Sequence, residues 1–175
     1  IDTDSGDTGG YLLLGRNSPT GALALASNAN VRFDVQGTQG EVFALGDLNR
    51  DGYDDFAFGG RFETQTRGGL LVFYGSAAYK TTTTGLVENA STADIQVHRR
   101  ATAELAGGIQ YDGKLRVSAG DFNADGKQDL LVVENGATFG SSGSLLDIIT
   151  KPRAWIEYSV ADDATSGAGV VTLAS

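Results

Sequence analysis

One sequence pattern occurs twice in this chain, and it constrains the fold more than any other feature. The segment FALGDLNRDGYDDFAF at 43–58 returns as VSAGDFNADGKQDLLV at 117–132, and G-D-x-N-x-D-G-x-x-D is identical in both copies. Asp121 of the second copy stands 74 positions after Asp47 of the first. A repeat at this spacing predicts a fold built from stacked copies of one unit, because a single unit cannot bury its own apolar face.

The segments between turns are short, rich in branched and aromatic residues, and often alternate between apolar and polar positions. No window shows convincing helical periodicity, so the sequence predicts an all-β chain. The predicted strands lie near residues 10–14, 22–26, 30–35, 41–45, 55–59, 69–74, 94–99, 101–106, 114–119, 129–134, 153–160 and 169–174.

About four strands fall within each repeated unit, which is typical of the four-stranded antiparallel blades of a β-propeller. The whole chain, 1–175, forms one repeat region in this interpretation. Residues 1–27 are the end of one blade, 28–86 are a blade with the first copy of the pattern, and 87–175 are a blade with the second. About two and a half blades cannot close a ring of the usual 4–8. We therefore expect the remaining blades to come from a longer chain or from other copies of this one.

Each copy of the pattern contains a short acidic loop, called here the first loop (residues 47–55) and the second loop (residues 121–129). Side chains at alternate positions can converge on one point, and the glycine permits the sharp turn that a Cβ resists. A hard cation with about six to eight oxygen ligands suits such donors, so the sequence predicts two calcium ions per chain. The predicted ligands are Asp47, Asn49, Asp51, the carbonyl of Tyr53 and Asp55, and then Asp121, Asn123, Asp125, the carbonyl of Lys127 and Asp129.

Two other kinds of loop share part of this sequence pattern. An EF-hand loop begins in the same way but needs a glutamate at its twelfth position. That position is Phe58 in the first copy and Val132 in the second, so neither loop is an EF-hand. A pair of Asx-rich hairpin turns without metal stays open, because Asp-Gly is itself a turn signal.

The composition narrows the function class. The formal net charge is −9, which argues against a nucleic-acid partner and suits cation binding. Cysteine is absent, so there is neither a disulfide framework nor thiol chemistry. No apolar run approaches the roughly 18 residues of a membrane span, and no signal peptide is visible. Methionine is also absent, even at position 1, and we expect the chain to be processed or part of something longer.

No arrangement of residues predicts catalysis, and we expect no enzymatic activity. His98 is the only histidine and stands in a predicted strand, where a surface role suits it better than a catalytic one. The acidic stretch at 1–10 aligns with a connection between strands rather than with the loops, so no metal is predicted there. The second unit carries an extra segment near 136–151, either a covering element or a contact loop.

The acidic loops, and the apolar strands that follow them, resemble the FG-GAP repeats of integrin α-subunit propellers and their bacterial relatives, also called VCBS-type repeats. The chain departs from the family where Gly59-Gly60-Arg61 stands in place of Gly-Ala-Pro. The resemblance implies a seven-bladed propeller, calcium at the ten residues named above, and an extracellular location, secreted or on the cell surface. It also implies binding or adhesion, with structural calcium and a protein or glycan as ligand.

Three alternative functions stay open from the sequence. One is a lectin-like propeller that binds carbohydrate, which glycan binding by the assembled propeller would favour. The second is a non-catalytic accessory domain of a secreted enzyme, such as a lyase or phospholipase, whose chemistry would lie elsewhere in a longer chain. The third is a purely structural scaffold within a very large adhesin or toxin.

Overall fold

The computed structural model describes residues 9–15, 21, 24–35, 37–62, 68–81, 86–99, 115–134, 153–157 and 169–173. Within these ranges the chain forms eleven strands and two one-turn helices. Neither helix of the described part has the length or apolar character that crossing a bilayer requires. The elements are β1 (Gly10–Leu12), α1 (Leu25–Asn28), β2 (Val31–Asp34), β3 (Gly37–Gly46), β4 (Asp55–Phe62), β5 (Gly68–Phe73), α2 (Ala78–Thr81), β6 (Leu86–Asn89), β7 (Ile95–Arg99), β8 (Leu115–Gly120), β9 (Asp129–Glu134), β10 (Arg153–Glu157) and β11 (Gly169–Leu173).

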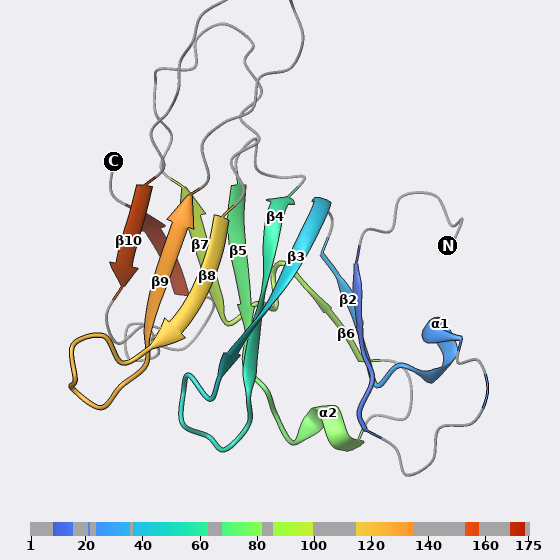
Figure 1. The fold of residues 1–175 in the computed structure, drawn as a ribbon. Coiled ribbons are helices and arrows are strands. Elements are labelled where there is room, and N and C mark those ends of the chain that lie inside the picture. The colour runs from blue at the N-terminus through green and yellow to red at the C-terminus, as the bar shows by residue number, and fades with distance from the viewer. Residues whose placement is uncertain are drawn as a thin grey trace, which may run out of the picture.

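These strands form three sheets that stack beside one another (Figure 1). The middle sheet has the strand order β11-β7-β5-β4-β3, and its β3, β4, β5 and β7 are antiparallel neighbours. The N-terminal sheet is β1-β2-β6, and the C-terminal sheet is β10-β9-β8, with both of the latter's pairings antiparallel. Two pairs are parallel, β2 with β6 and β7 with β11.

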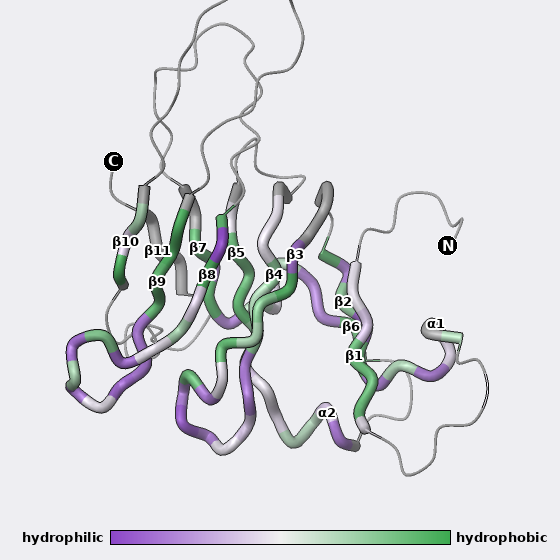
Figure 2. Tube along the Cα trace, viewed as in Figure 1, coloured by the Kyte–Doolittle hydropathy of each residue, from purple (hydrophilic) through white to green (hydrophobic). Residues whose placement is uncertain are grey.

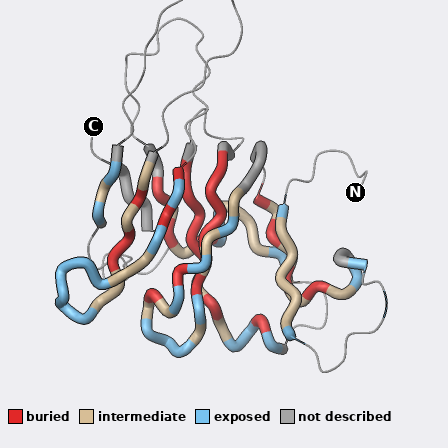
Figure 3. Tube along the Cα trace, viewed as in Figure 1, coloured by how far each residue is buried: buried red, intermediate tan, exposed pale blue. Residues whose placement is uncertain are grey.

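Burial alternates along β2 and β8, whereas the described residues of β4 and β5 are buried almost without interruption. Along β8, Leu115 and Val117 are buried while Arg116 and Ser118 are exposed. Figure 2 shows apolar residues concentrated in the strands and hydrophilic ones in the loops at the lower edge, and Figure 3 shows the same division in burial. β2 and β8 thus turn alternate side chains toward the middle sheet, which has a neighbouring sheet on each face.

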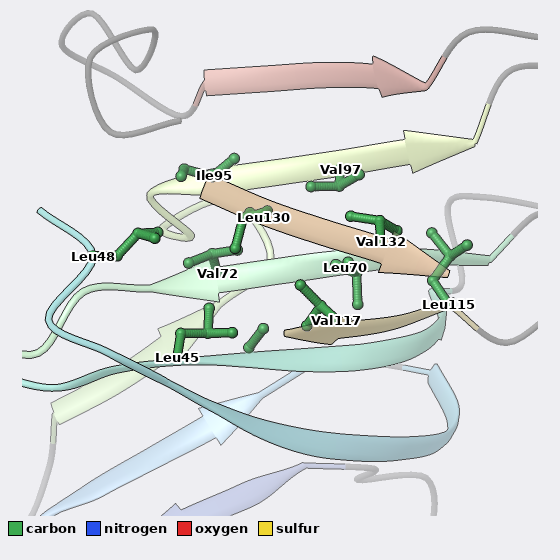
Figure 4. Packing of buried hydrophobic residues seen from close by; sticks show 11 residues of the cluster. Leu45, Leu48, Leu70, Val72, Ile95, Val97, Leu115, Val117, Leu130 and Val132 are labelled. Atoms are coloured by element: carbon green, nitrogen blue, oxygen red, sulfur yellow. The ribbon is translucent and has the colours of Figure 1, made fainter. Parts of the chain in front are cut away.

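Two core clusters hold the three sheets together. The first core cluster lies between the middle and C-terminal sheets, and Figure 4 shows its side chains meeting in the space between the strands. The second core cluster lies between the middle and N-terminal sheets. The buried members of the first are Leu45, Leu48, Ala57, Leu70, Val72, Ile95, Val97, Leu115, Val117, Leu130 and Val132; those of the second are Val31, Phe33, Val35, Phe58, Leu71, Phe73, Tyr79 and Ala93.

The all-β prediction is confirmed, and sheets stacked through apolar layers are compatible with part of a β-propeller. Ten predicted segments overlap a strand of the structure: 10–14, 30–35, 41–45, 55–59, 69–74, 94–99, 114–119, 129–134, 153–160 and 169–174. The predicted strand at 101–106, the acidic residues 1–8 and the extra segment at 136–151 lie outside the described residues.

The strand predicted at 22–26 is wrong in its described part, where one helical turn, α1, begins at Leu25. The backbone N–H of Asn28 donates to the carbonyl of Ala24 at 3.1 Å, and the Asn28 amide donates to the same carbonyl at 2.8 Å. Alanine and leucine favour helix. Their alternation in ALALAS imitates a strand pattern, but the local hydrogen bonds decide in favour of the turn.

The middle sheet has one strand more than the four predicted for a blade. The antiparallel four-stranded arrangement holds for β3, β4, β5 and β7, but β11 adds a fifth strand that is parallel to β7. The fourth strand, β7, lies beyond residue 86, where the sequence placed the start of the next unit. The short strand β6 was not predicted, because four residues that include a glutamate and an asparagine give a weak strand signal.

Replacement of Phe33 tests the second core cluster. The Phe33 ring lies 5.1–5.2 Å from the rings of Phe56, Phe58 and Phe73 and 6.4 Å from that of Tyr79. Phe33→Ala should lower the free energy of unfolding by roughly 3–5 kcal/mol, because it removes buried area and leaves a cavity. Urea denaturation measures this, and Phe33→Leu should lose distinctly less. Equal losses in the two variants would contradict the packing described.

Candidate functional site

Each acidic loop connects two consecutive antiparallel strands of one sheet, and the two sheets are neighbours. The first loop joins β3 to β4, the second joins β8 to β9, and both extend from the same edge of the stack (Figure 1). They lie close enough that Nη2 of Arg50 is 3.9 Å from the position that a Cβ on Gly126 would take. The predicted strand–loop–strand setting is therefore confirmed for both copies.

The backbone turns in the same way in both loops. Arg50 and Ala124 occupy equivalent positions, with φ of 63° and 60°, and the glycines two positions later, Gly52 and Gly126, have φ of 88° and 81°. Left-handed backbone is costly for residues with a Cβ. It persists in Arg50 and Ala124 because the surrounding side chains fix the loop through hydrogen bonds.

In the first loop the acidic and amide side chains accept the N–H groups of the turn. The carboxylate of Asp47 accepts the N–H groups of Asp51 at 3.0 Å and of Gly52 at 2.9 Å. Oδ1 of Asn49 also accepts the N–H of Asp51, at 3.0 Å, and the Asn49 amide donates to the Asp51 carboxylate at 3.1 Å. The other oxygen of Asp51 accepts the N–H of Tyr53 at 2.9 Å. Asp47, Asn49 and Asp51 thus all accept backbone N–H groups of the same turn.

The second loop reproduces these bonds at the equivalent positions. The carboxylate of Asp121 accepts the N–H groups of Asp125 at 3.1 Å and of Gly126 at 2.9 Å. Oδ1 of Asn123 accepts the Asp125 N–H at 2.9 Å, and the Asn123 amide donates to Asp125 at 3.0 Å. Asp125 in turn accepts the N–H of Lys127 at 2.8 Å. The identical residues of the repeat therefore serve identical local structure.

The last aspartate of each loop differs from the others because it is buried. Asp55 is 1% exposed and Asp129 is fully buried. The two oxygens of Asp55 accept three N–H groups, from Leu48 at 2.7 Å, Gly75 at 2.7 Å and Asn49 at 3.4 Å. Burial raises the pKa of Asp55 above its usual 3.8, and these three N–H groups oppose the rise by stabilising the charged form. This aspartate therefore stabilises the loop by binding N–H groups at its start and from the segment after β5.

Asp129 holds the second loop in the corresponding way. Its Oδ2 accepts the N–H of Phe122 at 2.8 Å, just as Asp55 accepts that of Leu48. Leu48 and Phe122 occupy the same loop position but differ in exposure, at 2% and 47%. Leu48 belongs to the first core cluster, whereas the Phe122 ring lies over Gly120. The first loop is thus anchored in a core, whereas Phe122 belongs to neither core cluster of the described residues.

The described residues contain no group of three or more histidine, cysteine, aspartate or glutamate side chains that could hold a metal ion as the side chains stand. In both loops the carboxylates instead accept backbone N–H groups. The donors themselves suit a hard cation, since a carboxylate has about four lone-pair positions and an amide oxygen two. In the first loop each oxygen of Asp47 accepts one N–H group, which leaves a second lone pair on each. The donor chemistry fits calcium with the N–H bonds kept.

Two residues near the first loop were not identified from sequence. Gly75 follows β5 and donates its N–H to Asp55, as described above. Asp94 precedes β7 and accepts the N–H of Tyr74 at 2.7 Å; burial raises the pKa of its carboxyl. The segment that follows β5 is therefore held by two carboxylates, one at the start of β4 and one just before β7. The glycine that directly follows the apolar run of β5 was the only sequence signal for this arrangement.

The chain is similar in sequence to a part of an integrin. Integrin alpha-M of Mus musculus is 31% identical to this chain over 116 residues, which are 66% of the chain and span 8% of the integrin. Over that stretch the chain is integrin-like. No protein-family model matches the chain, and no solved structure does. The similarity agrees with the predicted resemblance to integrin α-subunits, and the assignment to FG-GAP repeats stays a prediction.

Mutation can test whether the buried aspartate stabilises the first loop in the absence of metal. Asp55→Ala should destabilise the protein by roughly 2–5 kcal/mol in the presence of a chelator, because it leaves buried N–H groups without an acceptor. Asp54→Ala, at an exposed neighbouring aspartate, should change stability by less than about 0.5 kcal/mol. Denaturant unfolding of both variants measures the difference. A neutral Asp55→Ala would refute the structural role of this carboxylate.

Proposed function

We propose that this chain is a calcium-binding β-propeller module of an adhesion-type extracellular protein, with calcium in a structural role. One observation carries the proposal: the same oxygen-rich loop, with the same pattern of hydrogen bonds, occurs at the same edge of two neighbouring sheets. Turns without a common role would have no reason to keep the same oxygen-bearing side chain at every equivalent position. The similarity to integrin alpha-M supports an adhesion-type module.

Calcium is the ion that the donors fit best. Carboxylate, amide and backbone carbonyl oxygens are ligands of hard cations, and no histidine or cysteine occurs in either loop. The proposed ligands are those predicted from sequence: Asp47, Asn49, Asp51, the Tyr53 carbonyl and Asp55 in the first loop, and Asp121, Asn123, Asp125, the Lys127 carbonyl and Asp129 in the second. Magnesium fits less well, because it needs near-ideal octahedral geometry and retains its waters.

The loop geometry suggests a structural role for the ion. Each loop joins two adjacent strands, and its last proposed ligand is the first residue of the second strand. A cation there would neutralise the aspartates that now face the same turn and would hold the strand pair together. Binding of protein or glycan partners is proposed for the assembled module and not for the calcium sites themselves.

Calcium should raise the melting temperature. A ligand that binds only the folded state stabilises it by RT ln(1 + [Ca²⁺]/Kd), which is about 2.7 kcal/mol at a hundredfold excess over Kd. For a domain of this size that corresponds to an increase of several degrees. Thermal unfolding in chelator, in magnesium and in millimolar calcium measures it, and magnesium should give the smaller rise.

Matched variants assign the effect to the loops. Calorimetry should find two sites with Kd on the order of 10⁻⁵ to 10⁻³ M. Asp51→Ala and Asp125→Ala should each remove one site, and Asp54→Ala should remove none. Equal melting temperatures in chelator and calcium, or two sites left in the double variant, would reject the proposal.

Further blades are the expected neighbours of this module. In the middle sheet, Ala57 on β4 and Val72 on β5 are paired with each other and fully buried against the C-terminal sheet. The equivalent pair in the C-terminal sheet is Leu131 with Ile156, and Ile156 is 43% exposed. An apolar side chain at a position that its counterpart buries indicates where a following sheet would pack.

The isolated chain should therefore associate through this face. Sedimentation velocity should show concentration-dependent oligomers, and Ile156→Ser together with Phe122→Ser should reduce them. Val42→Ser is the matched control, because Val42 is 63% exposed but lies on β3 of the middle sheet. A wild-type chain that is monomeric at high concentration, or an equal effect of the control, would contradict this assembly.

A further inference from the structure

Gly75 lies where the first loop meets the end of β5. It is buried, and its N–H donates to Oδ1 of Asp55 at 2.7 Å across 20 positions of sequence. The other oxygen of Asp55 holds the N–H of Leu48 at the start of the loop. One carboxylate therefore connects the loop to a segment outside the strand pair that it joins.

The loop also occupies the space in which a side chain on residue 75 would lie. A Cβ on Gly75 would stand 2.8 Å from Cβ of Tyr53 and would collide with the carbonyl oxygen of Asp54. The second of these is a backbone atom, so the collision cannot be relieved by rotating a flexible side chain. The close approach of loop and strand end therefore requires glycine.

A second contact to the loop comes from α2, a few residues further along. Nζ of Lys80 lies 4.7 Å from the centre of the Tyr53 ring, within the range of a cation–π contact. Its neighbour Tyr79 is 7% exposed and belongs to the second core cluster, where its ring lies 6.4 Å from that of Phe33. The segment 75–80 thus joins the first loop to the second core cluster.

Together with Leu48, this gives the first loop an anchor in each core. Leu48 enters the first core cluster, between the middle and C-terminal sheets. The segment 75–80 leads to the second, between the middle and N-terminal sheets. We infer that Gly75 is the positioning residue of the first loop, and that it fixes the loop in the shape that binds calcium. The calcium part of this inference rests on the proposed function.

Preorganisation gives the inference a measurable consequence, because a loop held in its bound shape loses less entropy on binding. In an Asp125→Ala background, which leaves only the first site, Gly75→Ala should weaken calcium binding by about tenfold. In an Asp51→Ala background, which leaves only the second site, it should have no effect. Gly15→Ala is the matched control, because nothing lies within 4 Å of a Cβ there.

A second measurement needs no calcium. Hydrogen exchange in chelator should show faster exchange of amides 47–54 in Gly75→Ala and unchanged exchange of amides 121–128. If wild-type protein binds no calcium, the proposed function fails, and this comparison still decides the role of Gly75. If Gly75→Ala unfolds, Lys80→Ala replaces it in the exchange measurement alone, because loss of the Lys80 charge would itself strengthen calcium binding. Amides 47–54 should again exchange faster, by a smaller factor. Unchanged exchange and affinity in the first loop, or equal changes in both loops, would overturn the inference.

Discussion

The architecture of each loop depends on one buried carboxylate that accepts N–H groups from the turn it closes. Asp55 and Asp129 are the first residues of β4 and β9, and each accepts the N–H of the residue after the loop's first aspartate. A buried charge is costly unless hydrogen bonds compensate it. The N–H groups of a sharp turn need acceptors in the same place. The carboxylate supplies acceptors for the N–H groups, and the N–H groups compensate the buried charge, so the loop and the strand after it form together.

This arrangement separates the pattern into positions with different tasks. The final aspartate accepts backbone N–H groups and is buried, whereas the earlier aspartates and the asparagine are partly or largely exposed to solvent. The unvarying spacing of the repeat therefore reflects folding and proposed binding at once, and the two demands can be distinguished only residue by residue.

The sequence predicted what is local and left out what is long-range. Alternation identified strands such as β2 and β8, and the repeated pattern located both loops and the residue at which β4 and β9 begin. Alternation also misled at 22–26, where hydrogen bonds to Ala24 produce a helical turn. The parallel pairing of β7 with β11 joins residues over 70 positions apart, which no local pattern encodes. The role of Gly75 depends on a contact between two distant segments and could not be read from either alone.

The two loops are alike in their bonds and unlike in their surroundings, and stacking explains the difference. Leu48 is buried because a further sheet packs beside its own, and Phe122, at the same position, is half exposed at the end of the described stack. In any open stack of such sheets, one loop at the end lacks the neighbour that covers it. Closing the stack into a ring gives every sheet two neighbours and leaves no apolar face exposed, which is the physical advantage of a propeller over an arc.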